Sequence, residues 1–203
     1  MEWCEEVKKL SEFAITQPHA SLAAFIHGEQ HKFRYFMRTI PGMEEYLKPL
    51  DEVISERFLP AILDSQISET ERALYALPIR EGGLGISNFA SLAQSEFTAS
   101  TTVTAPLAAI IIMQETELPD AEAVQEAIRS KRLRCLAEQK LGVESIDATL
   151  SLATLCAVTQ AREKGASSLL SVQPSNEHGF SLNKSEFCDA IALHYHQNVK
   201  NLP

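Results

Sequence analysis

The sequence is poor in cysteine, and the cysteines it has are scattered. Its 203 residues include only four, Cys4, Cys135, Cys156 and Cys188, and none of them forms a Cys-x-x-Cys pair. This spacing argues against a zinc finger and against a disulfide framework. We therefore expect reduced thiols in an intracellular protein.

Positive charge is also scarce. The chain has 18 Lys and Arg against 27 Asp and Glu, which gives a net charge of −9 at pH 7. A protein that binds nucleic acid on its own normally has a basic face and a high pI, so this balance argues against such a protein. It is still compatible with a local basic patch inside a larger polyprotein.

No long hydrophobic run is present. The longest apolar stretch, residues 105–113, is too short to span a membrane and contains Pro106. The first residues, Met1, Glu2 and Trp3, begin an acidic amphipathic segment rather than a signal peptide. We therefore expect no membrane partner.

Glycine is rare, yet three of the 8 glycines stand within four positions. Gly82, Gly83 and Gly85 lie in residues 77–88, which read Leu-Pro-Ile-Arg-Glu-Gly-Gly-Leu-Gly-Ile-Ser-Asn. The cluster predicts a tight structural turn between packed helices, with a helix starting at Ser87 or Asn88. It does not match a phosphate-binding loop, because no Lys-Ser or Lys-Thr follows it and no strand is expected before it.

Elsewhere apolar residues recur at three- and four-residue spacing along nearly the whole chain. The pattern predicts an all-α fold, an irregular multi-helix bundle with one short extended hairpin near residues 169–182. Helix breaks are expected at residues 17–18, at residues 101–104 before Pro106, and at Gly142. Ser68 and Glu71 have the spacing of a capping box and predict a helix start.

The expected core consists of large apolar residues from the predicted helices and the glycine turn. These are Trp3, Phe13, Phe25, Phe36, Leu47, Phe58, Leu74, Leu84, Ile86, Leu107, Ile111, Leu152 and Phe187.

Catalytic patterns are missing from the sequence. Cys188, His194 and His196 are close together, but residues two apart on a helix point about 200° apart and make a poor metal site. Paired carboxylates such as Glu44–Glu45 are most simply solvated helix faces. A Tyr-x-Asp-Asp cluster, which a polymerase needs for its two metal ions, is absent. We predict no catalytic residue, no cofactor, no metal and no enzymatic turnover for this chain alone.

Two basic segments are the candidates for binding nucleic acid. Residues 31–38 (His-Lys-Phe-Arg-Tyr-Phe-Met-Arg) alternate cations with aromatics, which suits phosphate contact and base stacking. Residues 129–134 (Arg-Ser-Lys-Arg-Leu-Arg) hold four cations on a predicted helix. For both segments the simpler interpretation, an amphipathic helix with solvated cations, is favoured.

The glycine block also carries a resemblance. A Leu-Pro-x-Arg-x-Gly-Gly-Leu-Gly-Ile string followed by Asn resembles the region just after the polymerase core in non-LTR (LINE-type) retrotransposon reverse transcriptases. Further blocks similar to that family follow one another in order over nearly the whole chain. These are residues 13–20, 24–28, 38–42, 47–50, 58–61, 71–74, 106–107, 163–168 and 180–190.

The resemblance implies a post-palm fragment of a reverse transcriptase. Residues 1–115 would be a thumb-like helical region, and residues 116–203 a helical linker region preceding a zinc knuckle that this chain does not include. The chain would begin after the catalytic aspartates, so the fragment would not be catalytic. Its partner would be RNA or an RNA–DNA duplex, held within a larger polyprotein.

The residues expected to contact the nucleic acid are Lys32, Arg34, Arg38 and Arg80. An alternative stays open at this point. The chain would then be a domesticated helical protein-interaction module whose acidic surface dominates and which does not bind nucleic acid.

Overall fold

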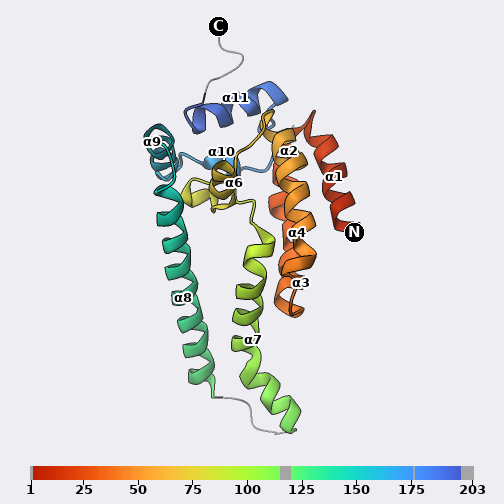
Figure 1. Ribbon diagram of the computed structural model, residues 1–203, viewed down its shortest axis with the longest axis vertical. Coiled ribbons are helices and arrows are strands. Elements are labelled where there is room, and N and C mark those ends of the chain that lie inside the picture. The colour runs from red at the N-terminus through yellow and green to blue at the C-terminus, as the bar shows by residue number, and fades with distance from the viewer. Residues whose placement is uncertain (1, 115–119, 176, 198–203) are drawn as a thin grey trace.

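A computed structural model describes residues 2–114, 120–175 and 177–197, which form helices joined by turns (Figure 1). This part of the chain contains no β-strand, so the predicted all-α class is confirmed. A helical body carries two long helices that extend together away from it, and this pair gives the molecule its elongated shape. We call the pair the arm.

The first half of the body is a set of packed helices, α1 (Glu2–Ala14), α2 (Pro18–Ala24), the π-helical segment η1 (Phe25–Glu29) and α3 (Gln30–Thr39). Proline in the first turn of α2 separates it from α1, which confirms the predicted break. The path from α2 to α3 is continuously helical. Trp3 contacts the rings of Phe33 and Phe36 and thereby joins α1 to α3.

The second continuous run is α4 (Glu44–Val53), the π-helical segment η2 (Ile54–Phe58) and α5 (Leu59–Leu63), which ends at Asp64 in a left-handed conformation. α6 (Glu69–Ala76) then begins with the predicted capping box of Ser68 and Glu71. The 3-10 turn η3 (Ile79–Glu81) leads into the glycine block.

The arm consists of α7 (Phe89–Met113) and α8 (Ala121–Asp147). Asn88 caps the start of α7, as predicted, but the break expected at residues 101–104 is wrong. The hydroxyls of Thr102 and Thr104 donate to carbonyls one turn earlier, so these β-branched residues fit the helix. Pro106 lies inside α7, whose far half bends away from the axis of its first half (Figure 1).

α8 continues through Gly142, so the stop predicted there is wrong. A glycine inside a helix costs only about 1 kcal/mol relative to alanine, and packing of the flanking Val143 keeps the helix together. By length and composition alone, α7 qualifies as a membrane-crossing helix within the described residues. In its first turns only Phe89 and Ala93 are buried, and they pack against the body.

The chain ends in α9 (Leu152–Ala161), α10 (Ser168–Ser171) and α11 (Lys184–His194). The hairpin expected near residues 169–182 is wrong, since its first piece is the helical turn α10. Ser167 fixes that turn by donating its hydroxyl to the Ala161 carbonyl, and the turn buries Leu170. Residue 176, within the expected hairpin, lies outside the described residues.

The core lies in the body, between α1–α5, α7 and α11. Among the expected core residues, seven are buried, namely Phe25, Leu47, Phe58, Leu74, Leu84, Ile86 and Phe187. Trp3 and Phe36 pack partly buried against them. Phe13, Leu107, Ile111 and Leu152 are exposed, so their assignment was wrong. Helical spacing identifies an apolar face, but it does not show whether another element covers that face.

Candidate nucleic-acid interface

The glycine turn is a compact structure in which each glycine has its own role. Gly82 and Gly85 have left-handed backbones, with φ of 80° and 74°. At Gly83 a Cβ would overlap the carbonyl oxygen of Leu77. The turn folds back on the end of α6, where the Gly85 N–H donates to Leu77 over 2.9 Å. The predicted structural turn is present at these positions.

Distant helices are joined to this turn. The Tyr195 hydroxyl donates to the Gly82 carbonyl over 3.1 Å, and Arg162 Nε donates to the Glu81 carbonyl over 3.1 Å. Arg162 also makes two 2.8 Å bonds to the carboxylate of Asp147 at the end of α8. Its hydrogen bond with Asp147 raises the pKa of Arg162. The turn therefore fixes where the arm leaves the body.

Arg72 and Asp51 form a buried ion pair next to the glycine turn, with Nη2 of Arg72 3.8 Å from Oδ1 of Asp51. Arg72 donates to the carbonyls of Ile86 and Ser87 over 2.9 and 3.0 Å. Asp51 accepts the N–H groups of Phe89 and Ala90 at the start of α7. Burial raises the pKa of Asp51, against the effect of these N–H groups and of Arg72. This pair could not be predicted, because nothing in the sequence marks residues in α4 and α6 as neighbours.

Three of the four predicted contact residues, Lys32, Arg38 and Arg80, are already paired with carboxylates. Lys32 lies 3.1 Å from Glu29 and 3.5 Å from Glu6, and the hydrogen bond with Glu29 raises its pKa. Arg38 pairs with Glu96 of α7 over 2.7 Å. Phosphate would have to displace these carboxylates before any of the three cations could bind it.

Arg34 and Arg80, two of the four predicted contact residues, line the same hollow. Arg34 comes from α3 and Arg80 from η3, and the hollow, of about 350 Å³, is also lined by Gln30 and Ser87. Arg80 donates to Gln139 of α8 over 2.8 Å, and its Nε lies 3.5 Å from Glu81.

Arg34 differs from the other three predicted cations. Its Nη2 donates to the Ser87 hydroxyl over 3.3 Å, and its buried Nε has no hydrogen-bond partner. Across the described ranges, no carboxylate forms an ion pair with it. A half-buried guanidinium without an ion-pair partner can bind an oxyanion through its Nη groups.

The second basic segment lies on α8. Its cations are exposed or half-exposed, and Arg129 lies 3.8 Å from Glu126. The residues weighed as a metal set do not converge either. His196 bonds Gln160, while the Cys188 thiol donates to the Ile62 carbonyl over 3.5 Å. Within the described residues no group of three His, Cys, Asp or Glu could hold a metal ion.

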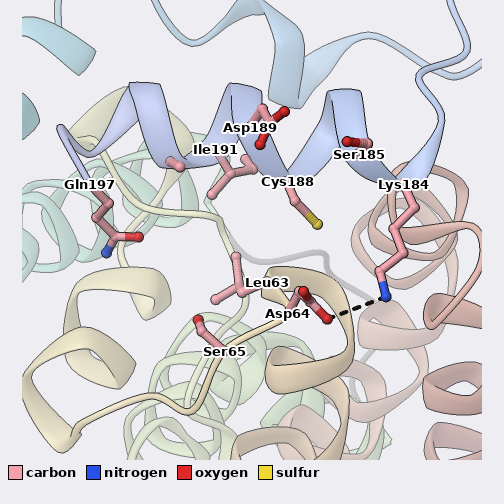
Figure 2. A pocket seen from close by; sticks show the side chains of 10 residues that line it. Leu63, Asp64, Ser65, Lys184, Ser185, Cys188, Asp189, Ile191 and Gln197 are labelled. Atoms are coloured by element: carbon pink, nitrogen blue, oxygen red, sulfur yellow. Dashed lines mark ion pairs between the residues drawn. The ribbon is translucent and has the colours of Figure 1, made fainter. Parts of the chain in front are cut away.

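A separate cleft of about 450 Å³ lies between α11 and the end of α5. Figure 2 shows Cys188 and Ile191 directed from α11 toward Leu63, with Lys184 paired to Asp64 over 3.3 Å at one side. This cleft could not be predicted from the sequence, because its two sides, residues 63–65 and 184–197, lie far apart along the chain.

Comparisons with known proteins add no relative. No protein-family model, curated protein or solved structure matches this chain.

Proposed function

We propose that this chain is a non-catalytic thumb and linker module of a non-LTR-type reverse transcriptase, which supports template–primer binding in a larger protein. The ordered blocks of residues similar to that family support this proposal. The carrying observation is the hollow shared by Arg34 and Arg80, since Arg34 belongs to the basic-aromatic segment and Arg80 to the glycine block.

The chemistry of the hollow suits a backbone phosphate. Phosphate accepts hydrogen bonds from planar guanidinium groups, and Arg34 has no ion pair with a carboxylate among the described residues. Lys32 and Arg38 would contribute less, because binding a phosphate there means giving up a carboxylate. We therefore rank Arg34 first among the four predicted contact residues, with Arg80, which is paired with Glu81, as its neighbour in the hollow.

The test is the salt dependence of binding to a labelled RNA–DNA hybrid, followed by fluorescence anisotropy. Each phosphate contact contributes a slope of about 0.9 to a plot of log affinity against log salt on duplex DNA. Replacing Arg34 and Arg80 with alanine should weaken binding and lower this slope by about 1.8, the equivalent of two phosphate contacts. The matched control replaces Arg57 and Lys164, two exposed cations outside the hollow.

The control variant loses affinity only through its more negative net charge, so its slope should stay closer to that of the wild type. An equal slope in both variants would remove the hollow from the proposal. Hybrid binding that is unchanged after Lys32, Arg34 and Arg38 all become alanine would remove the basic-aromatic segment as well.

A second function, a helical protein-interaction module, is favoured by a different observation. The arm exposes large apolar side chains, including Ile111 and Ile112, and the net charge of −9 opposes binding to nucleic acid. The same salt titration separates the two functions, because a protein interface of this kind does not show the steep fall in affinity that phosphate contacts produce.

A further inference from the structure

The far half of the arm exposes an apolar surface that a monomer does not bury. On α7 Ile111 is 74% exposed, Ile112 80% and Met113 66%. We define the arm patch as these three residues with Leu107, Ile128, Leu133 and Leu136, all of them exposed. We propose that the arm patch pairs with the arm patch of a second copy of this chain, in an antiparallel four-helix arrangement.

The size of the patch fits a homodimer. At the exposures observed, its seven side chains present roughly 600 Å² of apolar surface. A standard interface buries about 800 Å² per partner, of which about 500 Å² is apolar. Ile111, Ile112 and Met113 are consecutive on α7 and point to different sides of the helix, so the second copy has to contact α7 on more than one side.

Charge favours the arm as the place where two copies meet. Copies of a chain with a net charge of −9 repel one another over most of their surface. Residues 97–114 of α7, however, hold no charged side chain. An uncharged face can pair with itself without like charges facing each other, which an isologous two-fold interface requires.

The charges of α8 favour an antiparallel pairing. Its first turns are acidic, with Glu122 and Glu126, while the cations cluster in residues 129–134. A two-fold axis that sets α8 antiparallel to its copy, near Ile128, brings the acidic start of one helix beside the cationic run of the other. Opposite charges across an interface fix register and orientation.

A lipid surface fits the arm less well than a second copy. α7 contacts α8, which carries five Lys and Arg residues. Moving such cations into a hydrocarbon layer costs about 2.5–3.5 kcal/mol each at its centre. The first turns of α7 are also held in the body by Phe89.

Sedimentation equilibrium of the whole chain over a wide concentration range tests this proposal. The wild type should sediment as a dimer, and changing both Ile111 and Ile112 to glutamate should weaken dimerisation about 100-fold or more. The matched control is Leu193→Glu, which places the same charge on an exposed apolar residue of α11. This variant should remain a dimer. Circular dichroism checks that all variants keep their helices.

Charge reversal on α8 tests the antiparallel orientation of the two copies. Changing Glu122 and Glu126 to lysine should weaken the dimer, and adding Arg132→Glu and Arg134→Glu should restore it. A failure of this rescue would overturn the antiparallel pairing.

Three results would overturn the dimer itself. The first is a wild type that stays monomeric at the highest concentration. The second is a Leu193→Glu control whose dimer dissociates as readily as that of the Ile111 and Ile112 double variant. The third is a monomer that cosediments with phosphatidylcholine–phosphatidylserine vesicles. The last result would assign the arm patch to lipid. None of these results bears on hybrid binding at Arg34.

Discussion

Gly83→Ala tests whether the glycine turn holds the body and the arm together. A Cβ at this position would overlap the carbonyl oxygen of Leu77 and lie 2.6 Å from that of Leu74. Both obstacles are backbone atoms at the end of α6, so no side-chain rotation removes the clash. The turn would have to move away from α6, which also breaks the 2.9 Å bond from the Gly85 N–H to Leu77.

The magnitude follows from these two losses. Overpacking against a fixed neighbour costs about 1–3 kcal/mol, and losing a buried hydrogen bond costs about 1 kcal/mol. We expect Gly83→Ala to lower the free energy of unfolding by about 3 kcal/mol, a large fraction of the about 5–15 kcal/mol typical of a domain. Urea unfolding followed by circular dichroism measures this change.

Gly142→Ala is the matched control. Gly142 lies inside α8 with open space where a Cβ would stand, so alanine should stabilise the chain by about 1 kcal/mol. Gly85→Ala should fall between the two, because it meets only ordinary contacts but has a left-handed backbone costing about 1–2 kcal/mol. A Gly83→Ala variant within about 0.5 kcal/mol of the wild type would refute this account of the turn.

The remaining predictions concern the contacts around the turn. Asp51→Ala leaves the buried guanidinium of Arg72 without its carboxylate and should cost about 3 kcal/mol in thermal unfolding. Tyr195→Phe removes the bond to the Gly82 carbonyl and should cost about 1 kcal/mol in urea; an unchanged midpoint would argue against that bond. Burial lowers the pKa of His194 from its ordinary value of 6.5, so the unfolded chain takes up the proton first. The free energy of unfolding should therefore fall as pH drops below 6.5, and His194→Gln should flatten that fall. If the free energy of unfolding of the His194→Gln variant falls with pH as steeply as that of the wild type, His194 is not the cause of the fall.

Helix starts could be predicted from the sequence because their chemistry is local. The reciprocal bonds of Ser68 and Glu71 form within one turn, and Asn88 caps α7 through its own side chain. Helix interruptions were predicted less well. At Gly142 and Pro106 a local penalty of about 1–3 kcal/mol was expected to end a helix, and the two long helices of the arm continue through both.

The candidate interface was predicted in its residues but not in its arrangement. Arg34 and Arg80 were both named from the sequence, yet nothing there indicated that they share a hollow or that no described carboxylate forms an ion pair with Arg34. In the same way, the sequence did not show that Lys32 and Arg38 pair with Glu29 and Glu96. Pairs between helices depend on how the helices pack, and only the Lys32–Glu29 pair follows from helical spacing.

The sequence by itself determined the all-α class, most helix starts, the glycine turn and the acidic charge, because each depends on composition or on neighbours within a few residues. The tertiary structure alone decided which apolar faces are covered. Phe187 is buried while Ile111 is exposed, although both stand at helical spacing. The difference arises because α11 packs on the body, whereas the far half of α7 extends beyond it (Figure 1).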